Sequence, residues 1–341
     1  PPNEVLRRRV DVGLRVLSAS KKHPLSRGRI ACVGDVATLN VSRGCAGACV
    51  FCYARCYSNA PERDTLLVYH DLPGQLRRDL DSRRRRSPLP GYVVLASAGD
   101  PFLGGEQVVS VTRGCLDVLL RRGVGVSLST RGDIPDDIVE LLARYRDRVQ
   151  ITIPLASTSV DYTATWEPGT ASPEARLFLV QRLQSAGLEP TMHIEPLIPF
   201  VNDDSEQLRN VVSSMVGLGL KTAMLRLLQL RRGVADQLRR EAPTDHLRMV
   251  LGCFPSQQER GRPAEYDHVA PRQAMSILRR AQRIGREHGL RLQACRCHNP
   301  GLPAGRCQIA PRDPQPLGQS PADLFAGVEE QDLAAEEGSD S

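Results

Sequence analysis

Long hydrophobic runs are absent from this chain. No stretch approaches the roughly 18 apolar residues of a membrane-spanning helix, and the first twelve residues are charged and contain no apolar leader. Aromatic residues make up only 4% of the chain, with Trp166 as the single tryptophan, so few side chains can stack on nucleic acid bases. These absences predict a cytoplasmic protein with no membrane partner.

Lysine is also scarce, and arginine carries nearly all the positive charge. Only three lysines occur, and the formal net charge is +6. The eight charges after Arg312 are all acidic, so residues 1–312 carry about +14. A basic body favours phosphate-bearing substrates or nucleic acid, although the base composition of a genome produces the same arginine excess. The acidic tail, residues 311–341, is predicted to be disordered.

Cysteine, in contrast, is plentiful. Of ten cysteines, three lie between residues 45 and 52, and three more lie between residues 295 and 307. In a chain of this size with no secretion leader, such clustering favours metal ligation over disulfide bonds.

Short apolar runs alternate with amphipathic stretches from residue 37 onward. The runs predicted as strands are Thr38–Val41, Tyr92–Ser97, Val124–Ser129, Val149–Pro154, Thr191–Pro196, Ala223–Leu228 and Leu290–Ala294. The stretches predicted as helices are Leu72–Arg84, Val108–Arg122, Pro135–Tyr145, Pro173–Ala186, Ser205–Leu218 and Pro271–His288. Units of this spacing form right-handed βαβ crossovers and a parallel sheet.

The predicted fold is therefore of the α/β class, with a partial parallel (β/α)6 barrel over residues 35–235. An N-terminal extension, residues 1–34, contains a basic helix predicted over Val5–Leu17. A Cys-rich C-terminal cap is predicted over residues 236–310.

Three cysteines follow the first predicted strand in a C-x3-C-x2-C pattern, at Cys45, Cys49 and Cys52. A compact loop with this spacing can direct each thiolate to a different iron of a [4Fe–4S] cluster, leaving the fourth iron without a protein ligand. The loop lies at the carboxyl end of a strand, where α/β proteins form their sites. The alternative is a zinc site in a non-enzymatic protein, with Cys56 as the fourth ligand.

The string Gly44-Cys-Ala-Gly-Ala-Cys-Val-Phe-Cys-Tyr-Ala-Arg55 closely resembles the spore photoproduct lyase-like branch of the radical S-adenosylmethionine (SAM) superfamily. The likeness continues through Ser97–Phe102 with Glu106, and through Glu195–Asp203. It implies a radical SAM enzyme, in which reductive cleavage of SAM yields a 5′-deoxyadenosyl radical that abstracts hydrogen. It also implies a reducing partner of the flavodoxin or ferredoxin type.

The resemblance further implies contacts with SAM. Phe51 is expected beside the adenine, while Ser97 and Asp100 are expected to bind the methionine amino group or the ribose. Arg131 stands where the branch has lysine, and a guanidinium is suited to binding the SAM carboxylate. An aspartate before a proline is also a good turn starter, which is the alternative for Asp100.

Three more residues are implied as SAM contacts. Arg176 is expected to assist, with a solvated helix residue as the alternative. Leu197 and Ile198 are expected to line the adenine pocket. Outside the resemblance, His193 is a candidate for the barrel interior. Trp166 and Tyr162 are expected in a loop after the fourth strand, where they could line the substrate site.

The remaining cysteines suggest a second site. A possible auxiliary [4Fe–4S] cluster would use Cys253, Cys295, Cys297 and Cys307, with His298 as an alternative ligand. Alternatively, one thiol returns a hydrogen atom to a substrate radical. The candidate donors are Cys253, Cys295, Cys297 and Cys56. Unrelated structural thiols are the third possibility.

Three functions follow. The first is hydrogen abstraction from a small molecule of specialised metabolism (a sugar, an aminoglycoside-like or a nucleoside-derived intermediate), leading to epimerisation, C–C bond formation or rearrangement. The second is a lyase that repairs a DNA lesion, as in the namesake of the branch. The third is a non-enzymatic iron–sulfur or zinc protein. Nucleic acid is thus a less favoured partner than a small molecule.

Overall fold

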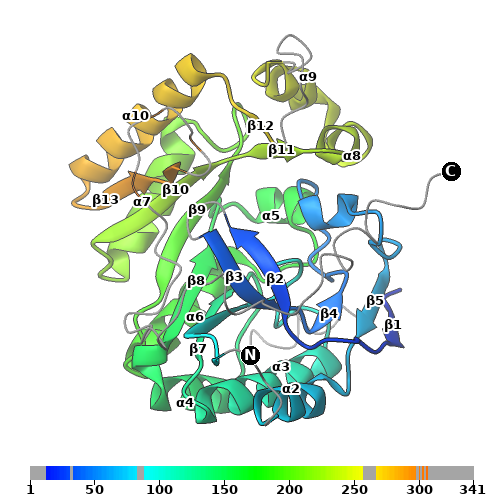
Figure 1. The fold of residues 1–341 in the computed structure, drawn as a ribbon. Coiled ribbons are helices and arrows are strands. Elements are labelled where there is room, and N and C mark those ends of the chain that lie inside the picture. Colours follow the sequence, from blue (N-terminus) through cyan, green and yellow to red (C-terminus); the bar gives the residue numbers. More distant parts are fainter. Residues whose placement is uncertain are drawn as a thin grey trace, which may run out of the picture.

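The computed structural model describes residues 13–30, 34–82, 88–255 and 266–296, together with Asn299, Leu302 and Gly305. An eight-stranded sheet forms the centre of the fold (Figure 1). Its strands are β2 (Ser26–Ile30), β3 (Gly34–Leu39), β6 (Tyr92–Leu95), β7 (Gly125–Ser129), β8 (Val149–Pro154), β9 (Thr191–Leu197), β10 (Thr222–Leu227) and β13 (Arg291–Ala294).

The strand order is β13-β10-β9-β8-β7-β6-β3-β2. β2 pairs antiparallel with β3, and all other neighbours in this sheet are parallel. The expected α/β class and the partial parallel barrel are confirmed. Six of its strands run in chain order from β3 to β10, and the seventh, β13, follows β10 at the edge, as right-handed βαβ units require.

Helices connect and cover the strands. They are α2 (Leu72–Leu80), α3 (Glu106–Arg121), α4 (Asp136–Arg144), α5 (Val160–Trp166), α6 (Pro173–Ser185), α7 (Ser205–Gly217), α8 (Val234–Glu241), α9 (Thr244–Gly252) and α10 (Pro271–Glu287), with 3-10 turns η1 (Tyr53–Cys56) and η2 (Arg146–Arg148). α10 shows why they pack: it buries Ile277, Ala281 and Ile284, spaced at three to four residues. Within the described ranges, no helix is both long and apolar enough to cross a bilayer.

The N-terminal helix predicted over Val5–Leu17 is wrong where the structure describes it. Arg15–Ser18 form strand β1, which pairs in parallel with β5 (Thr65–Val68) in a small sheet that also contains β4 (Ser42–Arg43). Leu14 and Val16 are half-buried, whereas Leu17 is exposed. The apolar period is therefore two, which is typical of a strand.

The C-terminal part returns to the barrel. β13 lies in the region predicted as a cap, yet it pairs with β10 and extends the central sheet. α8 and α9 stand apart from this sheet beside the antiparallel pair β11 (Gln229–Arg231) and β12 (Tyr266–His268). In Figure 1 they occupy the top right, opposite α2, α3 and α4 along the bottom.

Candidate active site

The three motif cysteines lie on one loop that follows β4; residues 44–52 are called the cysteine loop below. Gly44 begins it with φ +87°, and a Cβ at this position would lie 2.7 Å from the carbonyl oxygen of Thr65. Only glycine fits such a close backbone approach at positive φ. The start of the cysteine loop therefore packs closely against β5.

The cysteine thiols are half-buried and suited to a metal cluster. The backbone N–H of Gly47 donates to Cys45 Sγ at 3.4 Å. Burial raises the pKa of Cys45 well above its usual range and that of Cys49 to about 12. Such thiols stay protonated alone and ionise when they coordinate a metal. Three thiols with a backbone donor fit an iron–sulfur cluster, which Cys45, Cys49 and Cys52 would hold.

A single metal ion fits less well. In the part of the chain that the structure describes, no group of three or more His, Cys, Asp or Glu side chains could hold a metal ion. In a [4Fe–4S] cluster each cysteine binds a different iron, so the three sulfurs need not converge on one point. Cys56 Sγ donates instead to Gln237 Oε1 at 3.6 Å and to the carbonyl of Cys52 at 3.9 Å.

Helix α8 holds the outer side of the cysteine loop. Arg55 Nη1 donates to the carbonyl oxygen of Cys49 at 3.0 Å, and the same guanidinium forms a bidentate pair with Glu241 at 2.8 and 2.7 Å. Gln237 Nε2 donates to the carbonyl oxygens of Val50 and Cys52. Sequence reasoning missed Gln237 and Glu241.

Ser97 follows β6 and contacts η1, and its predicted contact with SAM stays a prediction. Its carbonyl oxygen accepts a hydrogen bond from the hydroxyl of Tyr53 at 2.6 Å. Asn40 Oδ1 accepts from Ala98 N at 3.0 Å and from Ser97 Oγ at 3.5 Å. The segment after β6 is thus joined by hydrogen bonds to the end of β3 and to η1, which directly follows the cysteine loop.

Asp100 uses both carboxylate oxygens within the protein. Oδ1 accepts from Phe102 N at 2.9 Å and from Thr130 Oγ1 at 2.7 Å, and Oδ2 accepts from Arg131 N at 2.7 Å. Burial raises the pKa of this carboxyl, although the same hydrogen bonds oppose the shift. Asp100 therefore joins the ends of β6 and β7, and its predicted contact with SAM stays a prediction.

Arg131 stands beside the cysteine loop, and Glu167 holds it there. Arg131 Nε donates to Glu167 Oε1 and Nη2 donates to the carbonyl oxygen of Glu195, both at 3.2 Å. Its guanidinium carbon lies 5.8 Å from the centre of the half-buried Phe51 ring. The side chain of Arg131 is 20% exposed, and among the described residues its Nη1 has no hydrogen-bond partner.

Arg176 lies behind this pair and is not a solvated helix residue. It is 1% exposed, and its Nη2 donates to Glu167 Oε2 at 2.5 Å. The other nitrogens donate to the carbonyl oxygens of Ala171 and Pro154, each at 3.0 Å. Enclosed in this way, Arg176 orients Glu167, and its predicted part in binding SAM stays a prediction.

Leu197 and Ile198 are fully buried in the hydrophobic core. The expected lining of an adenine pocket by these two side chains stays a prediction. Asn202 Oδ1 accepts from the backbone N–H of Ile198 at 2.7 Å and so joins the end of β9 to the turn that follows it.

β9 and β10 place a charged network near Arg131. Glu195 Oε2 contacts Arg226 Nη1 at 3.1 Å and His193 Nδ1 at 3.2 Å. Burial alone would raise the pKa of Glu195, but Arg226 and His193 hold it well below its usual range. Burial and Arg226 lower the pKa of His193, whose Nε2 is buried without a hydrogen-bond partner. Glu195 is therefore ionised and His193 neutral near pH 7.

The remaining cysteines are only partly described. Cys253 is buried at the end of α9, where its thiol donates to the carbonyl of Met249 at 3.4 Å. Cys295 is fully buried after β13. Cys297, Cys307 and His298 lie outside the described residues. The auxiliary cluster therefore stays a prediction.

Tyr162 and Trp166 lie in helix α5, where the sequence predicts a loop. Ser159 Oγ caps this helix by accepting from Tyr162 N at 3.2 Å. Both rings are buried and stack at 6.4 Å, and the carbonyl of Trp166 accepts from Val50 N at 3.0 Å. α5 thus supports the cysteine loop from within.

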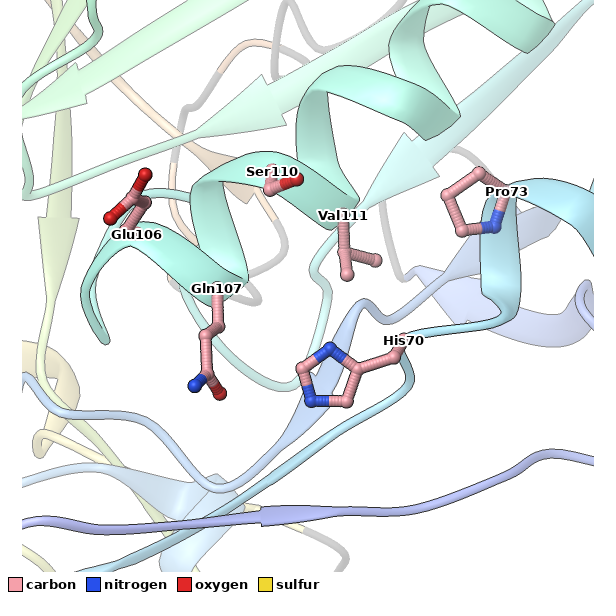
Figure 2. A pocket seen from close by; sticks show the side chains of 6 residues that line it. All are labelled: His70, Pro73, Glu106, Gln107, Ser110 and Val111. Atoms are coloured by element: carbon pink, nitrogen blue, oxygen red, sulfur yellow. The ribbon is translucent and has the colours of Figure 1, made fainter.

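A separate pocket of about 340 Å³ lies between the start of α2 and one face of α3 (Figure 2). Its lining residues are His70, Pro73, Glu106, Gln107, Ser110 and Val111. Of the residues in the resemblance, Glu106 lines it, and none of the motif cysteines does. This pocket is therefore not the candidate active site.

Comparison with known proteins gives the family of this chain. The profile of the Radical SAM superfamily matches residues 39–212. An uncharacterized protein of Mycobacterium tuberculosis is 27% identical over 203 residues, 57% of this chain and 59% of that protein. An uncharacterized protein of Acidianus two-tailed virus is 24% identical over 213 residues, 58% of this chain and 69% of that protein. The chain thus spans about three fifths of the length of the first relative.

Solved structures share the fold. Spore photoproduct lyase complexed with dinucleoside spore photoproduct superposes with a TM-score of 0.61 at 14% identity, over 84% of each chain. A variant of that lyase with bound AdoMet and dinucleoside spore photoproduct gives a TM-score of 0.62, again at 14% identity and over 84% of each chain. The profile match covers about half of the chain, which therefore belongs to the radical SAM superfamily, whose members use a [4Fe–4S] cluster and SAM.

Proposed function

We propose that this radical SAM enzyme abstracts hydrogen from a C–H bond of a small polar molecule, such as a sugar, an aminoglycoside-like or a nucleoside-derived intermediate. The observation that supports this substrate class is the carboxylate of Glu195, which is 22% exposed and pairs with Arg226, while the backbone carbonyl of Glu195 accepts from Arg131. A carboxylate next to a cofactor site can bind a hydroxyl or an ammonium group of a substrate. Arg226, paired with Glu195, fixes its orientation.

The residues that would hold the cofactors follow from the site. Cys45, Cys49 and Cys52 would bind the cluster, and Arg131 would bind the SAM carboxylate through Nη1. Once bound, the cluster and SAM supply a 5′-deoxyadenosyl radical. The protein contributes orientation, because Glu167 holds Arg131 and Asp100 fixes its backbone. Phe51 would pack against the adenine.

Epimerisation in specialised metabolism would need a thiol that returns hydrogen to the substrate. Cys253 and Cys295 are buried, and Cys56 faces Gln237. Cys297 is the remaining candidate, and it lies outside the described residues. C–C bond formation or rearrangement would need no such thiol.

Repair of a DNA lesion is the second candidate function, supported by the fold shared with spore photoproduct lyase and by the basic body. The test uses anaerobically reconstituted protein with dithionite and SAM. We expect hydroxyl- or amine-bearing small molecules to stimulate 5′-deoxyadenosine release, and UV-irradiated duplex DNA to have no effect. Lesion-dependent release, with duplex binding that weakens by about a thousandfold or more between about 50 and 200 mM salt, would reverse the choice.

The auxiliary cluster gives a separate prediction. If Cys253, Cys295, Cys297 and Cys307 bind a second cluster, reconstituted protein should contain about eight irons per chain. Replacing Cys295 and Cys297 together by alanine should reduce this to about four, while leaving the cubane signal of the SAM cluster. Iron analysis with EPR spectroscopy measures both. An iron content near four in wild type that the double replacement leaves unchanged would rule the second cluster out.

A further inference from the structure

Gln237 reaches the cysteine loop from α8, far along the chain. It is 2% exposed, and its Nε2 donates to the carbonyl oxygens of Val50 at 2.7 Å and Cys52 at 3.2 Å. Its Oε1 accepts from Cys56 Sγ at 3.6 Å. Figure 1 shows α8 next to the blue segment that contains η1. One buried amide therefore holds two carbonyls of the loop, one of them belonging to the cysteine ligand Cys52.

These two hydrogen bonds fix the orientation of two peptide groups. In a trans peptide the carbonyl and the following N–H point in opposite directions. Because Gln237 draws the carbonyls of Val50 and Cys52 toward α8, the N–H groups of Phe51 and Tyr53 point away from α8. Among the described residues neither N–H has an acceptor. In contrast, the N–H groups of Val50 and Cys52 donate to the carbonyl oxygens of Trp166 and Cys49, respectively.

Arg131 approaches the cysteine loop at Phe51. Its guanidinium lies over the Phe51 ring, and its charge opposes the rise in the pKa of Cys49. The N–H groups of Phe51 and Tyr53 flank the ligand Cys52 and have no acceptor among the described residues, so they are available to a cluster and to SAM bound at this loop. Hydrogen bonds to cluster sulfur stabilise the reduced form, since they offset its added negative charge.

The position of α8 is itself fixed by close packing. Gly233 precedes the helix with φ +84°, and a Cβ there would lie 3.0 Å from Cys56 Cβ. Arg55 connects Glu241 of α8 to the carbonyl of Cys49. The contact of Gln237 with the loop is therefore held at both ends of α8 and is not an incidental surface contact.

We infer that Gln237 is a positioning residue, which holds the Val50–Phe51 and Cys52–Tyr53 peptides so that their N–H groups face the cluster and the adenine of SAM. This inference rests on the proposed function, because it requires the cluster on Cys45, Cys49 and Cys52. It assigns to α8 an effect on the reduction potential of that cluster, transmitted through the two peptide groups.

The test replaces the amide with an isosteric side chain that has no donor, Gln237→Met. The variant should retain about four irons in the SAM cluster. At a fixed solution potential its ratio of reduced to oxidised cluster should fall about tenfold, which for one electron is a shift of about 59 mV. EPR-monitored redox titration measures this without SAM turnover. The matched control is Gln184→Met in α6, where the amide donates to the carbonyl of Leu218, and the control ratio should not change.

A second variant controls for misfolding of the first. Gln237→Glu keeps the size of the side chain but places a carboxylate against the two carbonyls, so its ratio of reduced to oxidised cluster should fall further than that of Gln237→Met. Either folded, cluster-containing variant with a wild-type potential would overturn the inference. A wild-type protein that forms no cubane signal would instead overturn the proposed function, so the two failures are distinguishable.

Discussion

Replacing Cys45, Cys49 or Cys52 by alanine is expected to remove the SAM cluster and with it all SAM cleavage. Three protein thiolates hold the cluster, and the fourth iron must stay open for SAM, so no remaining ligand can replace a lost one. The iron of the SAM cluster should fall from about four per chain to below about one. Release of 5′-deoxyadenosine should fall to the level of a protein-free control. Iron analysis and chromatography of the nucleoside measure both.

Cys56→Ala and Cys115→Ala are the matched controls. Cys56 is close to the loop, but its thiol faces Gln237, and Cys115 is fully buried in α3. Both variants should retain the iron and the cleavage of SAM, although Cys115→Ala leaves a small cavity and should unfold more readily. If Cys56→Ala instead lost all metal, and the metal were zinc, a four-cysteine zinc site would replace the cluster.

The sequence predicts the central parallel strands well because they carry their own signal. β8 carries an apolar residue at every second position and is buried along nearly its whole length, because both faces of a parallel sheet are covered. β2 has the sequence Ser-Arg-Gly-Arg-Ile and no apolar pattern. It is a strand because β3 offers it a free edge. Such edge strands depend on a partner that no local pattern reveals.

The site residues that could be predicted likewise carry a local sequence signal, whereas the others depend on a distant partner. The cysteines are recognisable by spacing, because one short loop must surround one cluster. Gln237 and Glu241 follow the loop by more than 180 residues, and α8, which comes after β10 and β11, meets it only in the folded chain. A weak signal existed in Arg55, a partly buried arginine in the motif that requires an acidic partner somewhere.

Removing the buried carboxylate of Glu167 should produce the largest loss of stability. Glu167 and Arg176 are each 1% exposed and pair at 2.5 Å, and Glu167 also binds Arg131. Glu167→Ala would leave the guanidinium of Arg176 buried without its counter-charge, which typically costs about 3–5 kcal/mol. Urea denaturation measures the free energy of unfolding. The control Glu174→Ala, at an exposed position in the first turn of α6, should cost at most about 1 kcal/mol.

Glu167→Gln separates the effect on the fold from the effect on the cofactor site. The amide keeps the volume and can accept from one arginine, so this variant should lose less stability than the alanine variant. In wild type, one carboxylate oxygen of Glu167 accepts from Arg131 and the other from Arg176. The amide has only one accepting oxygen, so it can no longer fix both arginines. Arg131 then has fewer constraints, and the dissociation constant for SAM should rise at least about tenfold, because charge-assisted pairs depend on orientation. Wild-type SAM affinity in a stable Glu167→Gln protein would mean that Glu167 supports the barrel alone, and that Arg131 does not depend on it to bind SAM.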